Sequence, residues 1–310
     1  MGTDSKRFSF VQLSDPHLST LANARWYQLL NKRLLGYISW RRNRRFEHRS
    51  EVLEALQLDL LKTPPDHLLI TGDLTHISLP DEFVQARQWL QSLGSPTDVT
   101  VIPGNHDAYV RVPWQQGLVH WQEYMVSDGA PNVAAQALFP SLRIRGPIAF
   151  IGLCSAVPTL PLLATGRVGK EQLHRLKSLL KETGRQGLFR VVFVHHPPVP
   201  GQEKWRKRLV DDRALCEVLV EYGAELVLHG HMHRSMDEQI EIPGGHIPVF
   251  GIPSSSAVGQ KPGRASQYFI YSVKKNGAQW QLDVQVKSYN RSEHVFEEER
   301  QFSLALPATH

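Results

Sequence analysis

The distribution of apolar residues along the chain predicts alternating strands and helices. Short runs rich in Val, Ile and Leu indicate buried strands at residues 8–13, 67–70, 99–102, 149–153, 190–194 and 226–229. Between several of these runs, apolar residues recur at three- and four-residue spacing, which indicates amphipathic helices at residues 81–93, 169–182 and 211–222. This alternation predicts an α/β core.

The pattern changes after His233. Alternating, turn-punctuated segments at residues 236–242, 248–252, 268–273 and 279–289 predict antiparallel strands of a second sheet. No low-complexity linker interrupts the chain, so we expect a single domain over residues 1–310. The aromatic and basic segment 24–49 and the segment 109–142 fit this core poorly, and we expect both to be insertions, the first helical, over the active face.

Composition narrows the class of protein. With 310 residues, 41% of them hydrophobic, the chain can bury a sizeable core. Cys154 and Cys216 are too few and too isolated for a disulfide framework or a zinc finger. No apolar run approaches the roughly 20 residues of a membrane span, and Met1–Arg7 lead directly into a strand, so we expect a cytoplasmic protein. The net charge of +5 permits an anionic partner without selecting one.

Polar residues follow three of the predicted strands where each strand ends. The first strand leads into Asp15 and His17, whose spacing suits chelation of one metal ion. The second leads into Asp73, and the third into Asn105, His106 and Asp107, each after a glycine that allows a tight turn. Taken singly, each motif is better explained as a loop that satisfies its own backbone.

Histidines follow two further strands, and here packing alone is a poor explanation. The run at residues 190–194 ends in His195 and His196, and the run at 226–229 leads through His229 into His231 and His233. Five histidines at two strand ends, beside acidic and amide residues at three others, indicate a metal site.

In order, the motifs DPH, GD, GNHD, HHPP and GHMH resemble those of the calcineurin-like metallophosphoesterases, over roughly residues 8–233. The resemblance implies a two-sheet β-sandwich flanked by helices. It also implies that one metal ion is held by Asp15, His17 and His233, that a second is held by Asn105, His195 and His231, and that Asp73 bridges the two.

The resemblance implies a hydrolase of phosphodiester or pyrophosphate bonds. Two cations roughly 3.5–4 Å apart can share a hydroxide, lower its pKa and clamp the attacking and leaving oxygens. His106 would then reach the phosphate, and Asp107 would orient it. A nitrogen and oxygen ligand set suits Mn²⁺, our first choice, as well as Fe or Zn²⁺. A metal-binding scaffold without activity is the alternative.

The segment from Trp26 to Arg45 bears on the substrate. It alternates aromatic, aliphatic and basic residues at helical spacing, as in helices that lie in an anionic membrane interface. A helix that packs its apolar side on the core explains the pattern equally well. A nucleic-acid groove is a weaker alternative, because no other part of the chain has a comparable basic track.

Within the family, an interfacial insertion after the first motif is similar to that of the hydrolases that split UDP-diacylglucosamine in lipid A synthesis. The motifs themselves are equally compatible with a soluble cyclic-nucleotide phosphodiesterase or a relaxed phosphomonoesterase, because variable loops choose the substrate. No feature of the sequence predicts an oligomeric state.

Overall fold

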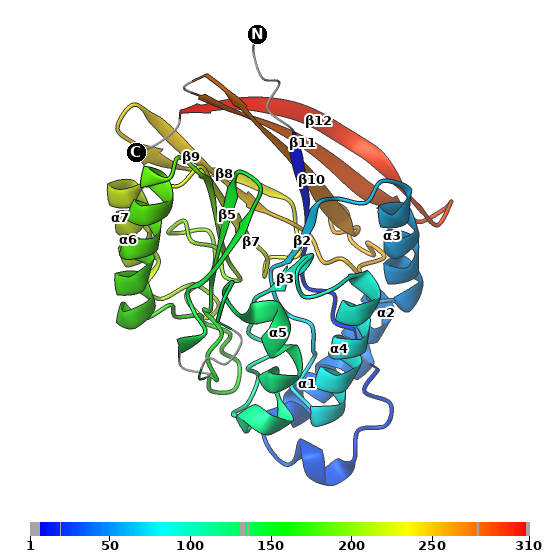
Figure 1. The fold of residues 1–310 in the computed structure, drawn as a ribbon. Coiled ribbons are helices and arrows are strands. Elements are labelled where there is room, and N and C mark those ends of the chain that lie inside the picture. The colour runs from blue at the N-terminus through cyan, green and yellow to red at the C-terminus, as the bar shows by residue number, and fades with distance from the viewer. Residues whose placement is uncertain (1–6, 19, 131–133, 135–136, 278, 308–310) are drawn as a thin grey trace.

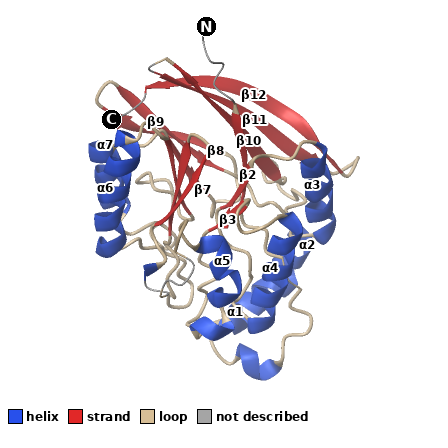
Figure 2. Cartoon of the chain, viewed as in Figure 1, coloured by secondary structure: helices blue, strands red, loops and turns tan. Residues whose placement is uncertain are grey.

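The computed structural model describes residues 7–18, 20–130, 134, 137–277 and 279–307. In this part of the chain, two mixed six-stranded sheets face each other and helices cover their outer sides (Figure 1, Figure 2). The first sheet has the order β12 (Val295–Pro307), β11 (Gln279–Asn290), β10 (Gln267–Asn276), β1 (Phe8–Leu13), β2 (His67–Ile70) and β3 (Val99–Val101). The second has the order β4 (Ser141–Arg145), β5 (Ile148–Leu153), β6 (Phe189–Val194), β7 (Leu226–His229), β9 (Gly245–Gly251) and β8 (Met236–Ile242). The predicted two-sheet α/β sandwich is therefore confirmed.

Parallel pairing brings the candidate site residues together. In the first sheet β1, β2 and β3 run parallel, and in the second β5, β6, β7 and β9 do so. The carboxyl ends of parallel strands gather at one edge of a sheet, where ligands bind in α/β folds. The loops that leave β1, β2, β3, β6 and β7 therefore meet at one place.

The hydrophobic core lies between the sheets and under the helices. Side chains alternate across the second sheet: Phe150 and Phe193 belong to the core cluster shared with the first sheet, and Ile151 and Val192 to the cluster under the helices. Phe10 joins the two sheets, because its ring centroid lies 5.1 Å from that of Phe150.

Helices cover both sandwich faces. The first sheet is packed by α3 (Ser50–Lys62) and α4 (Pro80–Leu93), and the second by α6 (Lys170–Arg185) and α7 (Asp212–Tyr222). The predicted helices at 81–93, 169–182 and 211–222 are confirmed to within a few residues, whereas α3 was not predicted.

One expectation about the sheets was wrong. The strands after His233 do not form a sheet of their own: β8 and β9 extend the second sheet, whereas β10, β11 and β12 extend the first. Each group covers an edge that the strands before His233 leave open: β10 pairs antiparallel with β1, and β9 pairs parallel with β7. The two chain halves are thus interwoven.

Segment 24–49 is built from short helical pieces, namely η1 (Trp26–Leu29), α1 (Arg33–Ser39), the π-helical turn η2 (Trp40–Arg44) and α2 (Arg45–Glu47). Figure 1 shows α1 at the end of the molecule away from β10–β12. Segment 109–142 contains η3 (Trp114–Gln116), η4 (Leu118–Trp121) and α5 (Gln122–Met125), and its last two residues belong to β4. Its residues 131–133 and 135–136 lie outside the described residues.

Three smaller expectations concern the thiols and the membrane. Cys154 and Cys216 are unpaired, as expected. Among the described residues, no helix combines the length and the apolar character that crossing a bilayer requires. The third expectation concerned Met1–Arg7, which lead directly into the first strand. Residues 1–6 lie outside the described part of the chain.

Candidate dinuclear metal centre

The candidate ligands sit at tight turns directly after the strands. Asp15, His17, Asp73, His231 and His233 all have positive φ angles, between 42° and 69°. Non-glycine residues adopt this left-handed conformation only where the surrounding structure enforces it, and such residues cluster at functional sites. The turns direct these side chains into a common space.

Two glycines make the close approach of these turns possible. A Cβ atom on Gly104 would clash with the carboxylate of Asp73, and a Cβ atom on Gly230 would clash with the hydroxyl of Ser14. Glycine was expected before the polar residues of the second and third motifs, and at Gly104 and Gly230 the neighbouring motif leaves no room for a side chain.

Four side chains form the first half of the centre. Nε2 of His233 lies 3.1 Å from Oδ1 of Asp15 and 3.4 Å from Nε2 of His17. Nε2 of His17 lies 4.0 Å from Oδ2 of Asp73. One ligand atom from each of these residues lies within 4.8 Å of every other, so a single cation can touch all four.

The second half of the centre shares Asp73. Nε2 of His195 lies 3.3 Å from Oδ2 of Asp73 and 3.1 Å from Oδ1 of Asn105. Nδ1 of His231 lies 2.8 Å from the same Asn105 oxygen. Because Oδ2 of Asp73 faces both halves, the structure places this residue where a bridging ligand would lie.

The donor set fits divalent cations. Nε2 of His231 is buried and has no hydrogen-bond partner within the described residues, and buried Oδ1 of Asp15 faces Nε2 of His233, itself a candidate ligand. Burial lowers the pKa of His195, but the charge and hydrogen bond of the Asp73 carboxylate, together with Asp15 and the Thr71 carbonyl, outweigh burial and raise that pKa to about 9. The centre therefore attracts positive charge, and its imidazole, carboxylate and amide donors match Mn²⁺, Fe and Zn²⁺.

Hydrogen bonds from outside the centre fix the ligands. His17 Nδ1 donates to the carbonyl of Thr75 at 2.9 Å, and His195 Nδ1 donates to the carbonyl of Thr71 at 2.7 Å. Each bond selects the tautomer whose Nε2 carries the lone pair, the usual arrangement around a metal-binding histidine. The backbone N–H of His231 donates to Oδ2 of Asp15 at 3.0 Å.

His106 lies beside the two halves, and its ring is held differently from the expectation. Its Nδ1 lies 2.5 Å from the carbonyl of His76, which can only accept, so Nδ1 carries the proton. The carboxylate of Asp107 instead accepts from the backbone N–H groups of Gly104 and Thr75, at 2.9 and 2.8 Å. Asp107 therefore holds the turn at Gly104 against the turn at Thr75. The carbonyl of His76, and not Asp107 as expected, orients the ring of His106.

The electrostatics of these two residues follow from burial. Burial raises the pKa of Asp107 to about 7, and the nearby Asp73 carboxylate adds to the effect. Burial also lowers the pKa of His106, and the guanidinium of Arg44 lowers it further.

Two residues of segment 24–49 enter the centre without having been predicted. Nη1 of Arg44 lies 3.0 Å from Nδ1 of His106, and the ring of His48 lies 4.5 Å from that of His17. The sequence shows several basic residues in this segment but not which of them turn inward, because the long-range packing of the helical pieces decides it.

His196, which follows the candidate ligand His195, is held by the protein itself. Both of its ring nitrogens have protein partners, Ser155 Oγ at 2.7 Å and the Ala164 carbonyl at 3.1 Å, which suits a structural role.

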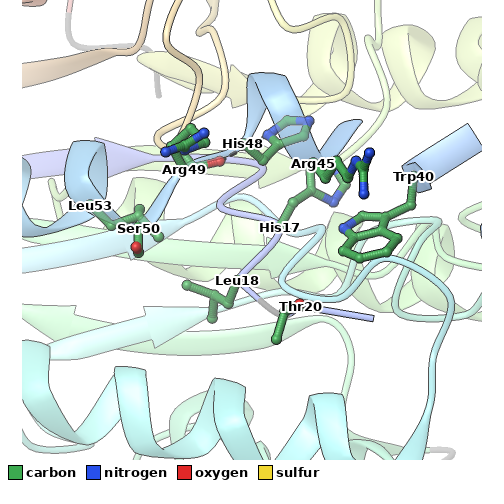
Figure 3. Close-up of a pocket in the computed structure, with 10 residues that line it drawn as sticks. His17, Leu18, Thr20, Trp40, Arg45, His48, Arg49, Ser50 and Leu53 are labelled. Atoms are coloured by element: carbon green, nitrogen blue, oxygen red, sulfur yellow. Dashed lines mark hydrogen bonds between the residues drawn. The ribbon is translucent and has the colours of Figure 1, made fainter. Parts of the chain in front are cut away.

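A cavity of about 200 Å³ opens beside the centre (Figure 3). His17 and His48 belong to its wall, and Trp40, Arg45 and Arg49 line it as well. A ligand bound at the centre can extend into this space and meet both cationic and apolar side chains.

Comparison with known proteins agrees with this geometry. The sequence profile of the calcineurin-like phosphoesterase family matches residues 8–235. A probable cyclic nucleotide phosphodiesterase of Synechococcus sp. (strain WH7803) is 26% identical over 253 residues, 79% of this chain and 81% of that protein. A probable glycerophosphodiester phosphodiesterase of Arcobacter nitrofigilis is 28% identical over 184 residues, 58% of this chain and 60% of that protein. A dimetal phosphatase from Danio rerio has the same fold, with a TM-score of 0.59 and 11% identity over 97% of this chain and 99% of that one.

Proposed function

Because the chain belongs to the calcineurin-like phosphoesterase family and is a metal-dependent phosphoric ester hydrolase, we propose that it cleaves a phosphodiester or pyrophosphate bond at this centre. The single observation that carries the proposal is the shared position of Asp73. Its Oδ2 atom faces His17 in one half of the centre and His195 in the other. Such an arrangement suits an in-line displacement at phosphorus.

The proposed ligands divide between two positions. Asp15, His17 and His233 hold one ion, Asn105, His195 and His231 hold the other, and Asp73 contacts both. Two divalent ions at these positions would activate water and polarise the phosphoryl oxygens. The nitrogen-rich donor set leads us to propose Mn²⁺, with Fe and Zn²⁺ as alternatives.

Two side chains lie where they can contact the substrate. Nδ1 of His106 is engaged by the His76 carbonyl, so Nε2 is the atom left to approach a phosphate oxygen or the leaving group, and it can donate a proton there once the ring is protonated. Arg44, beside this ring, supplies a positive charge that does not depend on the protonation of His106. Asp107 fixes the turn that carries both Asn105 and His106.

We further propose that the substrate is lipid-linked and is reached at an anionic membrane surface. In segment 24–49, Leu29 and Trp40 pack inward, whereas Trp26 and Leu30 are 74% and 72% exposed. Exposed Arg41 and Arg42 follow on the same segment. Apolar side chains next to cationic ones match a bilayer interface, where acyl chains lie below phosphate groups.

A neighbouring loop extends this surface. Nζ of Lys32 donates to the carbonyl of Leu163 at 3.1 Å, and Ala164 N donates to the carbonyl of Arg206 at 2.9 Å. These contacts connect segment 24–49 to three further apolar side chains that are at least 70% exposed, namely Leu160, Leu162 and Trp205. Trp205 stands among the exposed cations Lys204, Arg206, Lys207 and Arg208. Exposed apolar and cationic side chains thus lie next to each other near the centre. A lipid pyrophosphate such as UDP-diacylglucosamine, with acyl chains beside a charged group, fits such a site.

The second candidate is a soluble cyclic nucleotide. It is favoured by the probable cyclic nucleotide phosphodiesterase of Synechococcus, which aligns with 79% of this chain. A cyclic nucleotide has no need of an exposed apolar border, so the membrane surface separates the two candidates.

Hydrolysis assays test the proposal. With Mn²⁺ added, we expect turnover of bis(p-nitrophenyl) phosphate to exceed that of p-nitrophenyl phosphate, and to be lost in Asn105→Ala and His106→Ala. Higher turnover of UDP-diacylglucosamine in detergent than of cyclic AMP would support the lipid-linked substrate. The reverse order would support the cyclic nucleotide, and turnover of the monoester alone would contradict the phosphodiesterase proposal.

A further inference from the structure

His48 is firmly positioned beside the half of the centre that contains His17 and His233. It follows α2, and its N–H donates to the carbonyl of Arg44 at 2.8 Å. An isolated bridge pairs it with Ala257, and Arg49 N donates to the carbonyl of Ser256 at 2.9 Å. The backbone on both sides of His48 is therefore held, although the residue lies far from the family motifs in sequence.

Hydrogen bonds select one tautomer of His48. Its Nδ1 lies 2.9 Å from Ser256 Oγ and 3.2 Å from Ser254 Oγ. The hydroxyl of Ser254 donates its proton to the carbonyl of Asp15 at 2.6 Å, so its oxygen can only accept from His48. Nδ1 of His48 therefore carries the proton and Nε2 carries the lone pair. The carbonyl of Thr75 selects the same tautomer of His17, with the proton on Nδ1 and the lone pair on Nε2.

The ring of His48 faces the other imidazoles of this half. Its centroid lies 4.5 Å from that of His17 and 5.5 Å from that of His233, and Figure 3 shows His48 close to His17 at the cavity wall. One ligand atom from each of the three histidines lies within 4.8 Å of the others. Two nitrogen ligands with bonds of about 2.1 Å are at most about 4.2 Å apart across one ion. A small shift of these side chains therefore allows all three histidines to bind the same ion.

We propose that His48 is an additional ligand of the metal ion held by Asp15, His17 and His233. The proposal rests on the proposed function only in requiring that this half of the centre binds an ion. A third imidazole makes this position richer in nitrogen than the one at Asn105, where His195 and His231 supply two. The two positions then differ in affinity, and the first selects transition metals over Mg²⁺.

Metal titration tests this role without relying on activity. The full-length protein is stripped of metal and titrated calorimetrically with Mn²⁺, and with Co²⁺ followed by visible absorption. We expect the unaltered protein to bind two ions and His48→Ala to bind one of them about 10- to 100-fold more weakly. Asn105→Ala should weaken the other ion instead. The control His246→Ala removes an exposed histidine of β9 and should change neither affinity.

A second variant keeps the ring and removes its support. Ser256→Ala deletes an acceptor of the Nδ1 proton, and a several-fold loss at the same ion would support the proposal. Two unchanged affinities and an unchanged Co²⁺ spectrum in His48→Ala would overturn it, even if hydrolysis fell, because His48 would then act on the substrate. Failure of the unaltered protein to bind two ions would instead contradict the dinuclear centre itself.

Discussion

Nη1 of Arg44 lies 3.0 Å from Nδ1 of His106, although 62 residues separate the two in sequence. Burial lowers the pKa of Arg44, and the carboxylate of Asp73 opposes this effect. A guanidinium remains charged under such conditions, because its ordinary pKa lies far above neutral pH. Segment 24–49 thus delivers a permanent positive charge to the centre as well as an exposed apolar surface.

This contact predicts the effect of removing Arg44. Arg44→Ala should lower kcat/KM for bis(p-nitrophenyl) phosphate by roughly 10²- to 10³-fold, the usual loss of one transition-state donor. Arg44→Lys should recover only part of the loss, because an ammonium group cannot reproduce the planar geometry of a guanidinium. Steady-state kinetics at saturating Mn²⁺ measure both. Arg42→Ala is the matched control, since Arg42 is exposed on the same turn. Equal activity of the Ala variants at positions 42 and 44 would remove Arg44 from the mechanism.

Much of the centre was predictable because each motif directly follows a short buried strand. Runs such as residues 67–70 are buried on both faces, and their ends are marked by Gly72–Asp73 and similar pairs. Parallel pairing then brings distant motifs to one edge. The inward turn of Arg44 and His48 was not predictable, because it depends on long-range packing that places Arg44 beside His106 and on hydrogen bonds between His48 and the Ser254–Ser256 loop.

The strand β12 was missed for a different reason. It is an edge strand whose sequence contains Glu297, Glu298, Glu299 and Arg300 in succession, and most of its side chains are exposed. Of its described residues Phe296 and Leu306 are buried, and apolar alternation is confined to Phe302, Leu304 and Leu306, because four successive charged residues interrupt the pattern that reveals a strand. Charged residues on an edge strand protect a sheet from pairing with another chain. The same residues make such a strand hard to predict from its apolar pattern.

The exposed apolar surface predicts membrane binding that is separable from catalysis. Trp26→Ala combined with Leu30→Ala should weaken binding to vesicles with anionic lipid by about 10- to 100-fold, since each side chain contributes on the order of 1 kcal/mol by partial insertion. Turnover of soluble bis(p-nitrophenyl) phosphate should be unchanged. Trp40 is unsuitable for this test, because it is buried. Vesicle co-sedimentation measures the effect.

A control for this experiment lies on α3. Leu58 and Leu61 are 64% and 73% exposed there, away from segment 24–49, and their double substitution by Ala should leave vesicle binding unaltered. Two outcomes would contradict a specific membrane-binding surface on segment 24–49. One is equal weakening of vesicle binding by both double variants, and the other is vesicle binding that high salt does not reduce.

A buried ion pair predicts a large loss of stability at β6. Arg190 and Glu225 are almost fully buried, and Nη2 of Arg190 lies 2.7 Å from Oε1 of Glu225. Glu225→Ala leaves the guanidinium uncompensated and should lower the free energy of unfolding by about 3–5 kcal/mol. Urea denaturation measures this. Glu182→Ala, which removes an exposed partner of Arg185, should cost under about 1 kcal/mol. Similar losses in both variants would contradict this assignment.

His67 predicts part of the acid sensitivity of the fold. Its Nε2 lies 2.8 Å from Oγ1 of Thr100 and its ring stacks on Phe150 at 4.8 Å. Burial lowers the pKa of His67 from 6.5 to about 3, so between these values the unfolded chain binds a proton that the folded protein does not. The stability contributed by neutral His67 is therefore present above pH 6.5 and is lost as the pH falls toward 3.

His67→Gln removes this titration while retaining a group that can reach Thr100. Between pH 6.5 and 5, the unaltered protein should lose about 1.6 kcal/mol more of its free energy of unfolding than the variant, because the slope approaches about 1.4 kcal/mol per pH unit only below pH 6.5. Urea denaturation of both metal-free proteins at each pH measures the difference, so that protonation of the metal-site histidines contributes equally to the two curves. Parallel curves would mean that His67 is protonated in the folded state, and burial would then have failed to hold it neutral.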